Sequence, residues 1–128
     1  MDFNIKYLSW KTKVSSYVKY LSGENNYDFD NIKQFYNNGF EDKVVALIIS
    51  KNIIKKHINK NSWWEDINRA FTLFDIKMND SMRQKIIDKE FPKNPLNVAC
   101  KIIKDYGYLS LSLYTEKENI DTKKFINN

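Results

Sequence analysis

Apolar residues recur along most of this chain at intervals of three and four, which is the spacing of an amphipathic α-helix. Residues 5–22 follow this spacing with Tyr7, Trp10, Val14, Tyr17, Val18 and Leu21. Gly23 comes next, in a position where a residue of left-handed conformation commonly ends a helix. The first residues also fit a short strand, because Phe3, Ile5 and Tyr7 alternate with polar residues.

Two helices are predicted in the next part of the chain. A short helix over 31–37 has Asp30 as its N-cap residue and ends at Asn38-Gly39. A longer helix over 41–58 carries apolar residues around more than half of its circumference. That width predicts that it is the central and most buried helix of the fold.

Capping signals predict further helices downstream. Ser62 and Glu65 form a capping-box pattern, in which each side chain can bond the other's backbone N–H, at the start of a helix to about residue 74. Ser81 and Gln84 repeat this pattern and open a second helix, which ends before the next proline.

Asn94-Pro95 supplies an N-cap residue followed by a first-turn proline, so another helix is predicted from there to Gly107. Residues 108–114, "YLSLSLY", then alternate with a period of two, as a strand does. Such a strand would pair with residues 2–7 or with a copy of itself in a dimer. We favour a helix or a small local pairing.

These elements predict a mainly α fold, a single compact bundle of about five to six helices with room for one short strand pairing near the termini. The length of 128 residues suits one domain, which we expect to span 1–115. Residues 116–128 are polar and are expected to form a loosely held C-terminal tail.

Net charge and hydropathy narrow the classes of function. The chain carries 21 basic and 16 acidic residues, a net charge of +5. Only Arg69 and Arg83 are arginine, the residue best suited to reading guanine and gripping phosphate, so nucleic acid is an unlikely but open partner. The N-terminus has no apolar signal region, and no apolar run approaches membrane length. We therefore expect a cytoplasmic protein without a membrane partner.

No pattern in the sequence predicts catalysis, a metal site or a cofactor. Cys100 is the single cysteine and lies in an apolar run typical of a small core residue, while His57, the single histidine, is expected at the surface. The acidic pairs Glu41-Asp42 and Glu65-Asp66 point about 100° apart on a helix, and their positions in a first turn suit the helix dipole. We expect no enzyme activity.

Residues 25–42, "NNYDFDNIKQFYNNGFED", are unusual for a basic protein. Four acidic residues and one lysine give this acidic segment a charge of −3, and it holds five aromatic residues. Aromatic anchors with acidic neighbours are typical of a surface that binds a basic protein. The alternative is that the aromatics fill the core and the acids cap helices, which leaves Tyr27, Asp28 and Tyr36 without a structural role.

Trp63-Trp64 is a second candidate, because adjacent rings on a helix point in different directions. We expect one of them to be partly exposed, unless the 75–80 loop covers it. Exposed tryptophan commonly anchors an interface. The predicted partner-binding residues are Tyr27, Asp28, Asp30, Tyr36, Glu41, Asp42, Trp63 and Trp64.

A stripe of lysines favours a different use. It comprises Lys51, Lys55, Lys56 and Lys60. It is either the solvated face of the 41–58 helix or a surface that follows a phosphate backbone. The second possibility would suit a phage- or plasmid-type regulator or inhibitor acting on nucleic acid or on a nucleic-acid enzyme. A metabolic enzyme would need a deep pocket with converging polar groups, which the sequence does not indicate.

In size, composition and its segment 25–42, the chain resembles bacterial immunity proteins of contact-dependent inhibition and other polymorphic-toxin systems. This resemblance implies a cognate protein toxin with a basic surface, bound stoichiometrically by a monomer or weak dimer without a cofactor. Immunity proteins that bind nucleases are usually acidic overall, and this chain departs from them by being basic.

Overall fold

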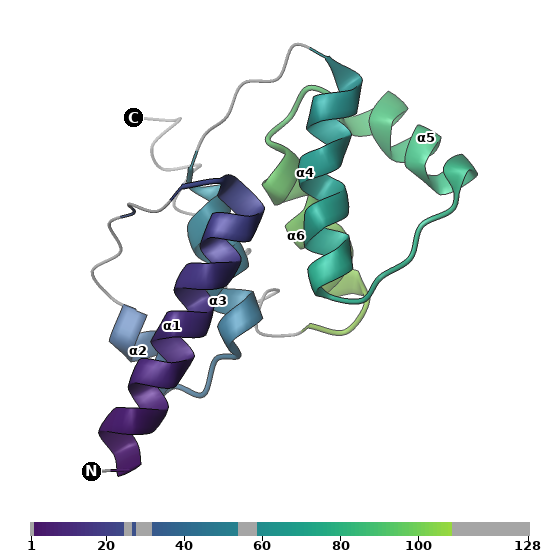
Figure 1. Ribbon diagram of the computed structural model, residues 1–128. Coiled ribbons are helices and arrows are strands. Elements are labelled where there is room, and N and C mark those ends of the chain that lie inside the picture. The colour runs from purple at the N-terminus through teal and green to yellow at the C-terminus, as the bar shows by residue number, and fades with distance from the viewer. Residues whose placement is uncertain (1, 25–26, 28–31, 54–58, 109–128) are drawn as a thin grey trace, which may run out of the picture.

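The computed structural model describes residues 2–24, 27, 32–53 and 59–108 (Figure 1). These ranges contain six helices and no strand. The helices are α1 (Asp2–Ser22), α2 (Ile32–Asn37), α3 (Asp42–Lys51), α4 (Lys60–Leu73), α5 (Asp80–Glu90) and α6 (Pro95–Asp105). The prediction of a mainly helical bundle of five to six helices is confirmed.

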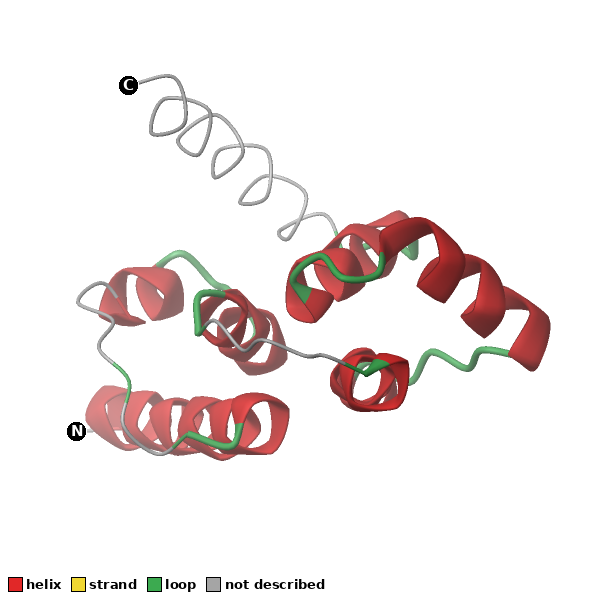
Figure 2. Ribbon diagram, turned by 90° about the horizontal axis from the view of Figure 1, so that it is seen from above, coloured by secondary structure: helices red, strands yellow, loops and turns green. Residues whose placement is uncertain are grey.

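Two helix pairs, α1 with α3 and α4 with α6, form the body of the fold. Contacts of α3 with α6 and of α1 with α4 join the pairs over one continuous apolar core. In Figures 1 and 2, α2 lies beside the N-terminal half of α1, whereas α3 lies beside its C-terminal half. Helix α5 lies on the far side of α4, so α2 and α5 occupy opposite ends of the molecule.

The first helix begins at Asp2, so the strand alternative for the first residues is wrong. The helical spacing turns Val14, Val18 and Leu21 into the core and leaves Ile5 at the surface, 67% exposed. The predicted stop at Gly23 is confirmed, with φ of 79° and an N–H that bonds the Lys19 carbonyl at 2.8 Å.

Helix α3 is the most enclosed helix, as predicted, because every residue from Val44 to Lys51 is buried. It ends at Lys51, however, and the prediction of a helix to residue 58 is wrong. The Asn52 amide donates to the Ile48 carbonyl at 3.1 Å, which satisfies an acceptor that a further helical turn would otherwise use. Residues 54–58, with the predicted last turn and His57, lie outside the described ranges.

Both predicted capping boxes are wrong, because each helix begins earlier at an asparagine. Asn59 caps α4 by accepting from the Ser62 N–H at 2.8 Å. Asn79 caps α5 by accepting from the Met82 N–H at 2.9 Å. Asparagine is at least as good an N-cap residue as serine, and the upstream asparagines lengthen the two helices by three and two residues.

Asn94 caps α6 as predicted, with a side-chain oxygen that accepts from the N–H groups of Leu96 and Asn97 at 3.0 and 3.3 Å. The helix ends at Asp105, and Gly107 follows with φ of 108°. Of residues 108–114, for which a strand and a helix were the alternatives, only Tyr108 belongs to the described residues. The predicted tail at 116–128 also lies outside them. No helix in the described part of the chain combines the length and apolar character needed to cross a bilayer.

Candidate partner-binding surface

Trp63 and Trp64 are both buried, with exposures of 1% and 8%, so the prediction that one of them is partly exposed is wrong. The Trp63 indole donates to the Lys93 carbonyl at 2.6 Å and meets the Phe91 ring edge-on at 5.5 Å. The covering residues come from the connection that follows α5. Trp63 therefore offers no surface to a partner in this conformation.

Trp64 is enclosed from two sides. Its ring meets Phe71 edge-on at 6.0 Å, and the Arg83 guanidinium lies 5.7 Å from the ring centroid. The two indoles do point in different directions. Phe71 of the core covers part of their surface, and α5 with the segment that follows it covers the rest. Sequence spacing predicts the directions of the rings and not the distant segments that cover them.

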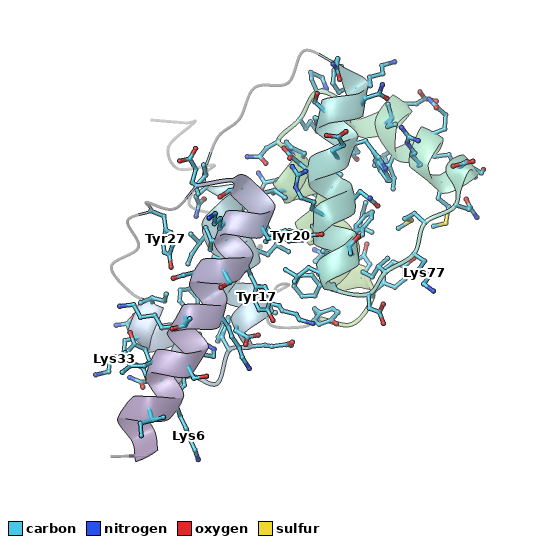
Figure 3. The ribbon with its side chains drawn as sticks, in the orientation of Figure 1. Lys6, Tyr17, Tyr20, Tyr27, Lys33 and Lys77 are labelled. Carbon is cyan, nitrogen blue, oxygen red and sulfur yellow. The ribbon has the colours of Figure 1, made fainter. Side chains whose placement is uncertain are left out.

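Tyr27, from the acidic segment, is half-buried against the core. Its hydroxyl lies 2.8 Å from the hydroxyl of Ser15 and so joins the segment to α1. In Figure 3, Tyr27 and Lys33 lie on the same side of α1. Tyr27 thus has a structural role that the sequence did not reveal. Asp28 and Asp30 lie outside the described residues.

Tyr36 belongs to a group of three half-buried rings, which we call the α1–α2 aromatic cluster and which comprises Tyr7, Trp10 and Tyr36. The Tyr36 centroid lies 5.2 Å from those of both Tyr7 and Trp10, in edge-to-face geometry. Tyr7 and Trp10 are 6.1 Å apart with planes inclined by 24°. Edge-to-face and offset rings at these distances attract each other, so the cluster is a fixed arrangement of aromatic faces.

Contacts on its inner and outer sides hold the cluster in place. The Trp10 indole N–H donates to the Phe40 carbonyl at 3.1 Å, and the Phe40 ring meets Phe35 edge-on at 5.0 Å. On the outer side the Lys33 ammonium lies 5.7 Å from the Tyr7 centroid, within cation–π range. None of the described residues of α2 is fully buried, so this end of the molecule is only thinly covered.

Tyr7 and Trp10 were not predicted as binding residues, because their spacing marks them as core positions of α1. They do face inward, but the N-terminal half of α1 lies beside α2 and the main core lies further along the helix (Figure 2). No signal in the sequence indicated this, because the predicted helices 5–22 and 41–58 are equally long, whereas α1 has 21 residues and α3 has 10.

Two aliphatic side chains are exposed on the same stretch of α1. Ile5 is 67% and Leu8 57% exposed, and residues three apart on a helix are neighbours on its surface. Around the helix Ile5 points roughly 160° away from Tyr7, and Leu8 roughly 160° away from Trp10, so the two form a separate pair on the outer face of α1. Exposed aliphatic side chains are ordinary by themselves, and the half-buried aromatic cluster is the more specific candidate for a contact surface.

Glu41 and Asp42 stand at the start of α3, as predicted, with Glu41 at the N-cap position. Glu41 is exposed and its side chain makes no capping hydrogen bond. Asp42 is half-buried, and its carboxylate accepts from the Lys43 N–H at 2.8 Å. The charge of Glu41 therefore lies at the surface, next in the chain to Phe40, whose carbonyl binds Trp10.

Lys51 is buried, at 3% exposure, which contradicts its place in the predicted lysine stripe. Helix α3 is enclosed on all sides at this position, and the Lys51 carbonyl accepts from the Asn94 amide at 2.9 Å. Desolvation lowers the pKa of Lys51, and the neighbouring Cys100 thiol opposes that change. Lys60 is exposed, and Lys55 and Lys56 lie outside the described ranges.

Cys100 is fully buried, as predicted for a core residue. Burial raises the pKa of its thiol to about 12, although the nearby Lys51 ammonium acts in the opposite direction. A thiol with so high a pKa is almost wholly protonated near neutral pH, and the thiolate is the reactive form. Cys100 is therefore a chemically inert member of the core.

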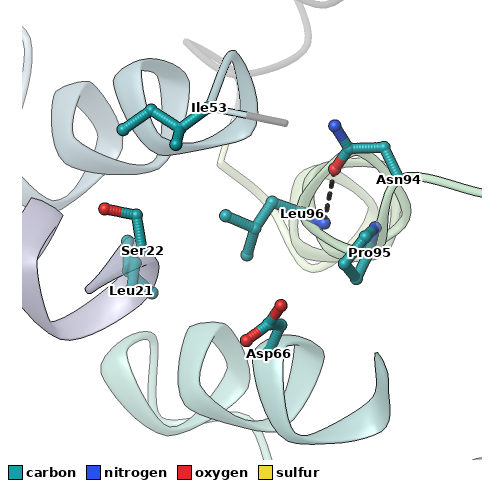
Figure 4. A pocket seen from close by; sticks show the side chains of 7 residues that line it. All are labelled: Leu21, Ser22, Ile53, Asp66, Asn94, Pro95 and Leu96. Atoms are coloured by element: carbon teal, nitrogen blue, oxygen red, sulfur yellow. Dashed lines mark hydrogen bonds between the residues drawn. The ribbon is translucent and has the colours of Figure 1, made fainter. Parts of the chain in front are cut away.

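A small cavity lies where the C-terminus of α1 meets α3, α4 and α6 (Figure 4). It is lined by Leu21, Ser22, Ile53, Asp66, Asn94, Pro95 and Leu96. Its polar groups are engaged, since the Ser22 hydroxyl donates to the Val18 carbonyl at 2.7 Å and Asp66 forms an ion pair with Arg69. The space is about what one water molecule needs, which is too small for a substrate.

The described acidic, histidine and cysteine side chains include no group of three that could hold a metal ion. Of the second acidic pair, Glu65 is exposed and Asp66 is buried, so the two carboxylates do not converge. Comparison with protein-family models, with curated proteins and with solved structures finds no match to this chain.

Proposed function

We propose that this chain is a non-catalytic binding protein that neutralises a partner protein, as bacterial toxin-immunity proteins do. The observation that carries the proposal is the α1–α2 end, where Tyr7, Trp10 and Tyr36 form a half-buried aromatic cluster and the outer face of α1 exposes Ile5 and Leu8. Aromatic side chains that are already fixed in place lose little conformational freedom on binding, so they are efficient anchors of an interface.

The charge of the neighbouring segment supports a basic partner. Residues 25–42 carry a charge of −3, and Glu41 lies at the surface at the start of α3. Acidic groups around an apolar contact speed the approach of a basic protein and disfavour acidic competitors. An interface of ordinary size, about 1,600 Å², at nanomolar affinity, about −12 kcal/mol, is expected.

The test is capture of the partner with three forms of the tagged chain. Leu8→Asp places a charge on the outer face of α1 at the α1–α2 end, and Tyr106→Asp places one at the end of α6. Tyr106→Asp is the control for Leu8→Asp, because Leu8 and Tyr106 are similarly exposed, at 57% and 53%, and neither belongs to the core. We expect one protein to be retained by the wild type and by Tyr106→Asp and to be lost with Leu8→Asp.

The captured protein is then purified and its activity titrated with this chain. The proposal predicts complete inhibition at one equivalent of wild-type chain and no inhibition by Leu8→Asp. A partner that remains active with the chain saturating it would rule out neutralisation. Retention of the same partner by all three forms would rule out the α1–α2 end as the contact.

A further inference from the structure

A positively charged side chain of this chain, Lys33, contacts the Tyr7 ring of the α1–α2 aromatic cluster. The Lys33 ammonium lies 5.7 Å from the Tyr7 centroid, so the ring already holds a cation of this chain. Lys33 is exposed and Tyr7 is half-buried, which places the contact at the boundary between protein and solvent. Both residues belong to the partly covered end formed by α1 and α2.

We infer that the outer face of Tyr7 is a receptor for a basic side chain of the partner, preferably an arginine, and that Lys33 is the chain's own competitor for this site. The inference rests on the proposed function in one respect, since the basic partner supplies the cation. Beyond the proposed function, the inference names the chemical group of the partner that is recognised, a guanidinium, and the residue of this chain that competes with it, Lys33.

The geometry around Tyr7 suits a guanidinium. Tyr36 meets Tyr7 edge-on at 5.2 Å, and Trp10 lies offset from it at 6.1 Å, so the position of the Tyr7 ring is fixed by both. A planar guanidinium stacks on an aromatic face better than an ammonium does and is more weakly hydrated. An incoming arginine can therefore displace the lysine although both carry one positive charge.

The charge of Lys33 adds the electrostatic part. When a partner's arginine covers Tyr7, the Lys33 ammonium moves away from the ring, and its repulsion of the newcomer opposes binding. Removing the charge of Lys33 is thus expected to tighten binding, which is the reverse of what loss of a stabilising contact would do.

The experiment uses the full chain and a fluorescently labelled hexa-arginine peptide at low ionic strength, with hexa-lysine as the second probe. Lys33→Met removes the competitor, and Lys6→Met is the matched control. Lys6 precedes Tyr7 in the chain and is also exposed, and Figure 3 places it near the N-terminal end of α1. Both variants lose one positive charge at this end, but only Lys33 lies over the ring.

We expect Lys33→Met to bind hexa-arginine about two- to fivefold more tightly than Lys6→Met does, the factor typical of an exposed cation–π contact. The gain should be smaller for hexa-lysine. It should persist when Tyr7→Phe is added to Lys33→Met and disappear when Tyr7→Leu is added, because phenylalanine keeps the aromatic face. Thermal unfolding of each variant verifies that it is folded.

Equal gains for Lys33→Met and Lys6→Met would overturn the inference, because the effect would then be one of net charge. A gain that survives Tyr7→Leu in a folded variant would overturn it as well. The peptide experiment needs no partner protein. Its failure therefore leaves the proposed function standing, whereas failure to find a neutralised partner leaves this cation site standing.

Discussion

The indole N–H of Trp10 donates a hydrogen bond to the main-chain oxygen of Phe40 at 3.1 Å, across 30 positions of sequence. The bond ties the N-terminal half of α1 to Phe40, the residue before the N-cap of α3. It holds the Trp10 ring of the α1–α2 aromatic cluster in one orientation. The cluster is therefore fixed before any partner arrives, which lowers the entropic cost of binding.

Trp10→Phe should lower the free energy of unfolding by about 1 kcal/mol, because it removes the donor and leaves the Phe40 carbonyl without this bond. The aromatic ring and most of its packing remain. Urea denaturation measures the change, with Tyr106→Phe as the control at an exposed position. Equal stability of wild type and Trp10→Phe would show that the bond contributes nothing.

Asn94 performs two tasks. Its oxygen caps α6, and its amide donates to the Lys51 carbonyl at 2.9 Å, which joins α6 to the end of α3. Asn94→Ala should therefore cost about 2 kcal/mol, roughly 1 for the cap and roughly 1 for the second bond.

Asn79→Ala is the matched control for Asn94→Ala, because Asn79 caps the peripheral α5. It should cost about 1 kcal/mol, the typical value for a cap alone. Urea denaturation of both variants compares the two costs. If they were equal, the bond between Asn94 and Lys51 would have no energetic weight.

The stability of the fold should fall with rising pH because of Cys100. Burial raises the pKa of this thiol from 9.0 to about 12, so the unfolded state loses the proton first. The contribution of the protonated Cys100 thiol to the free energy of unfolding is fully present below pH 9 and is lost as the pH rises toward 12. Between about pH 8 and 10 the loss should be about 1 kcal/mol.

The comparison for this prediction is Cys100→Ala, which lacks the thiol. The difference in unfolding free energy between wild type and variant should decline over that pH range. Lys51 changes in the opposite direction, since its pKa is lowered, but it is present in both proteins. A difference that stays constant up to pH 10 would show that the thiol is not desolvated in the fold.

Helix α5 should open more readily than the rest of the molecule. Ile87 is its one buried residue, whereas eight consecutive residues of α3, Val44–Lys51, are buried. Segments with few buried contacts open at low free energy. Hydrogen exchange followed by mass spectrometry should find the α5 amides exchanging orders of magnitude faster than those of α3. Similar protection in both helices would contradict this.

The helices α1, α3, α4 and α6 could be predicted from the sequence because each of them buries an apolar stripe. The enclosure of α3 followed from the width of its stripe, and the end of α1 followed from Gly23. The cap positions of α4 and α5 were missed by two or three residues. Asn59 and Asn79 are about as good as cap residues as the downstream serines, so sequence preference alone does not distinguish the two positions.

The candidate surface was harder to predict, because exposure depends on distant segments. Lys51 and Trp63 are buried by residues more than 25 positions away in sequence, around Asn94 and Lys93. Conversely, Tyr7 has the spacing of a core residue, but the segment that meets it is the short α2. Spacing shows which side chains share a face, and the covering of that face is a property of the tertiary fold.

The most direct test of the central claim is the affinity of the purified partner for Tyr36→Ala, measured by calorimetry beside Tyr20→Ala. Both tyrosines are at least partly accessible, but only Tyr36 belongs to the aromatic cluster. A central anchor typically costs about 2 kcal/mol or more on truncation, so Tyr36→Ala should bind about 30-fold more weakly. Tyr20→Ala should bind like the wild type. Wild-type affinity in Tyr36→Ala would contradict the claim that this protein acts through its α1–α2 end.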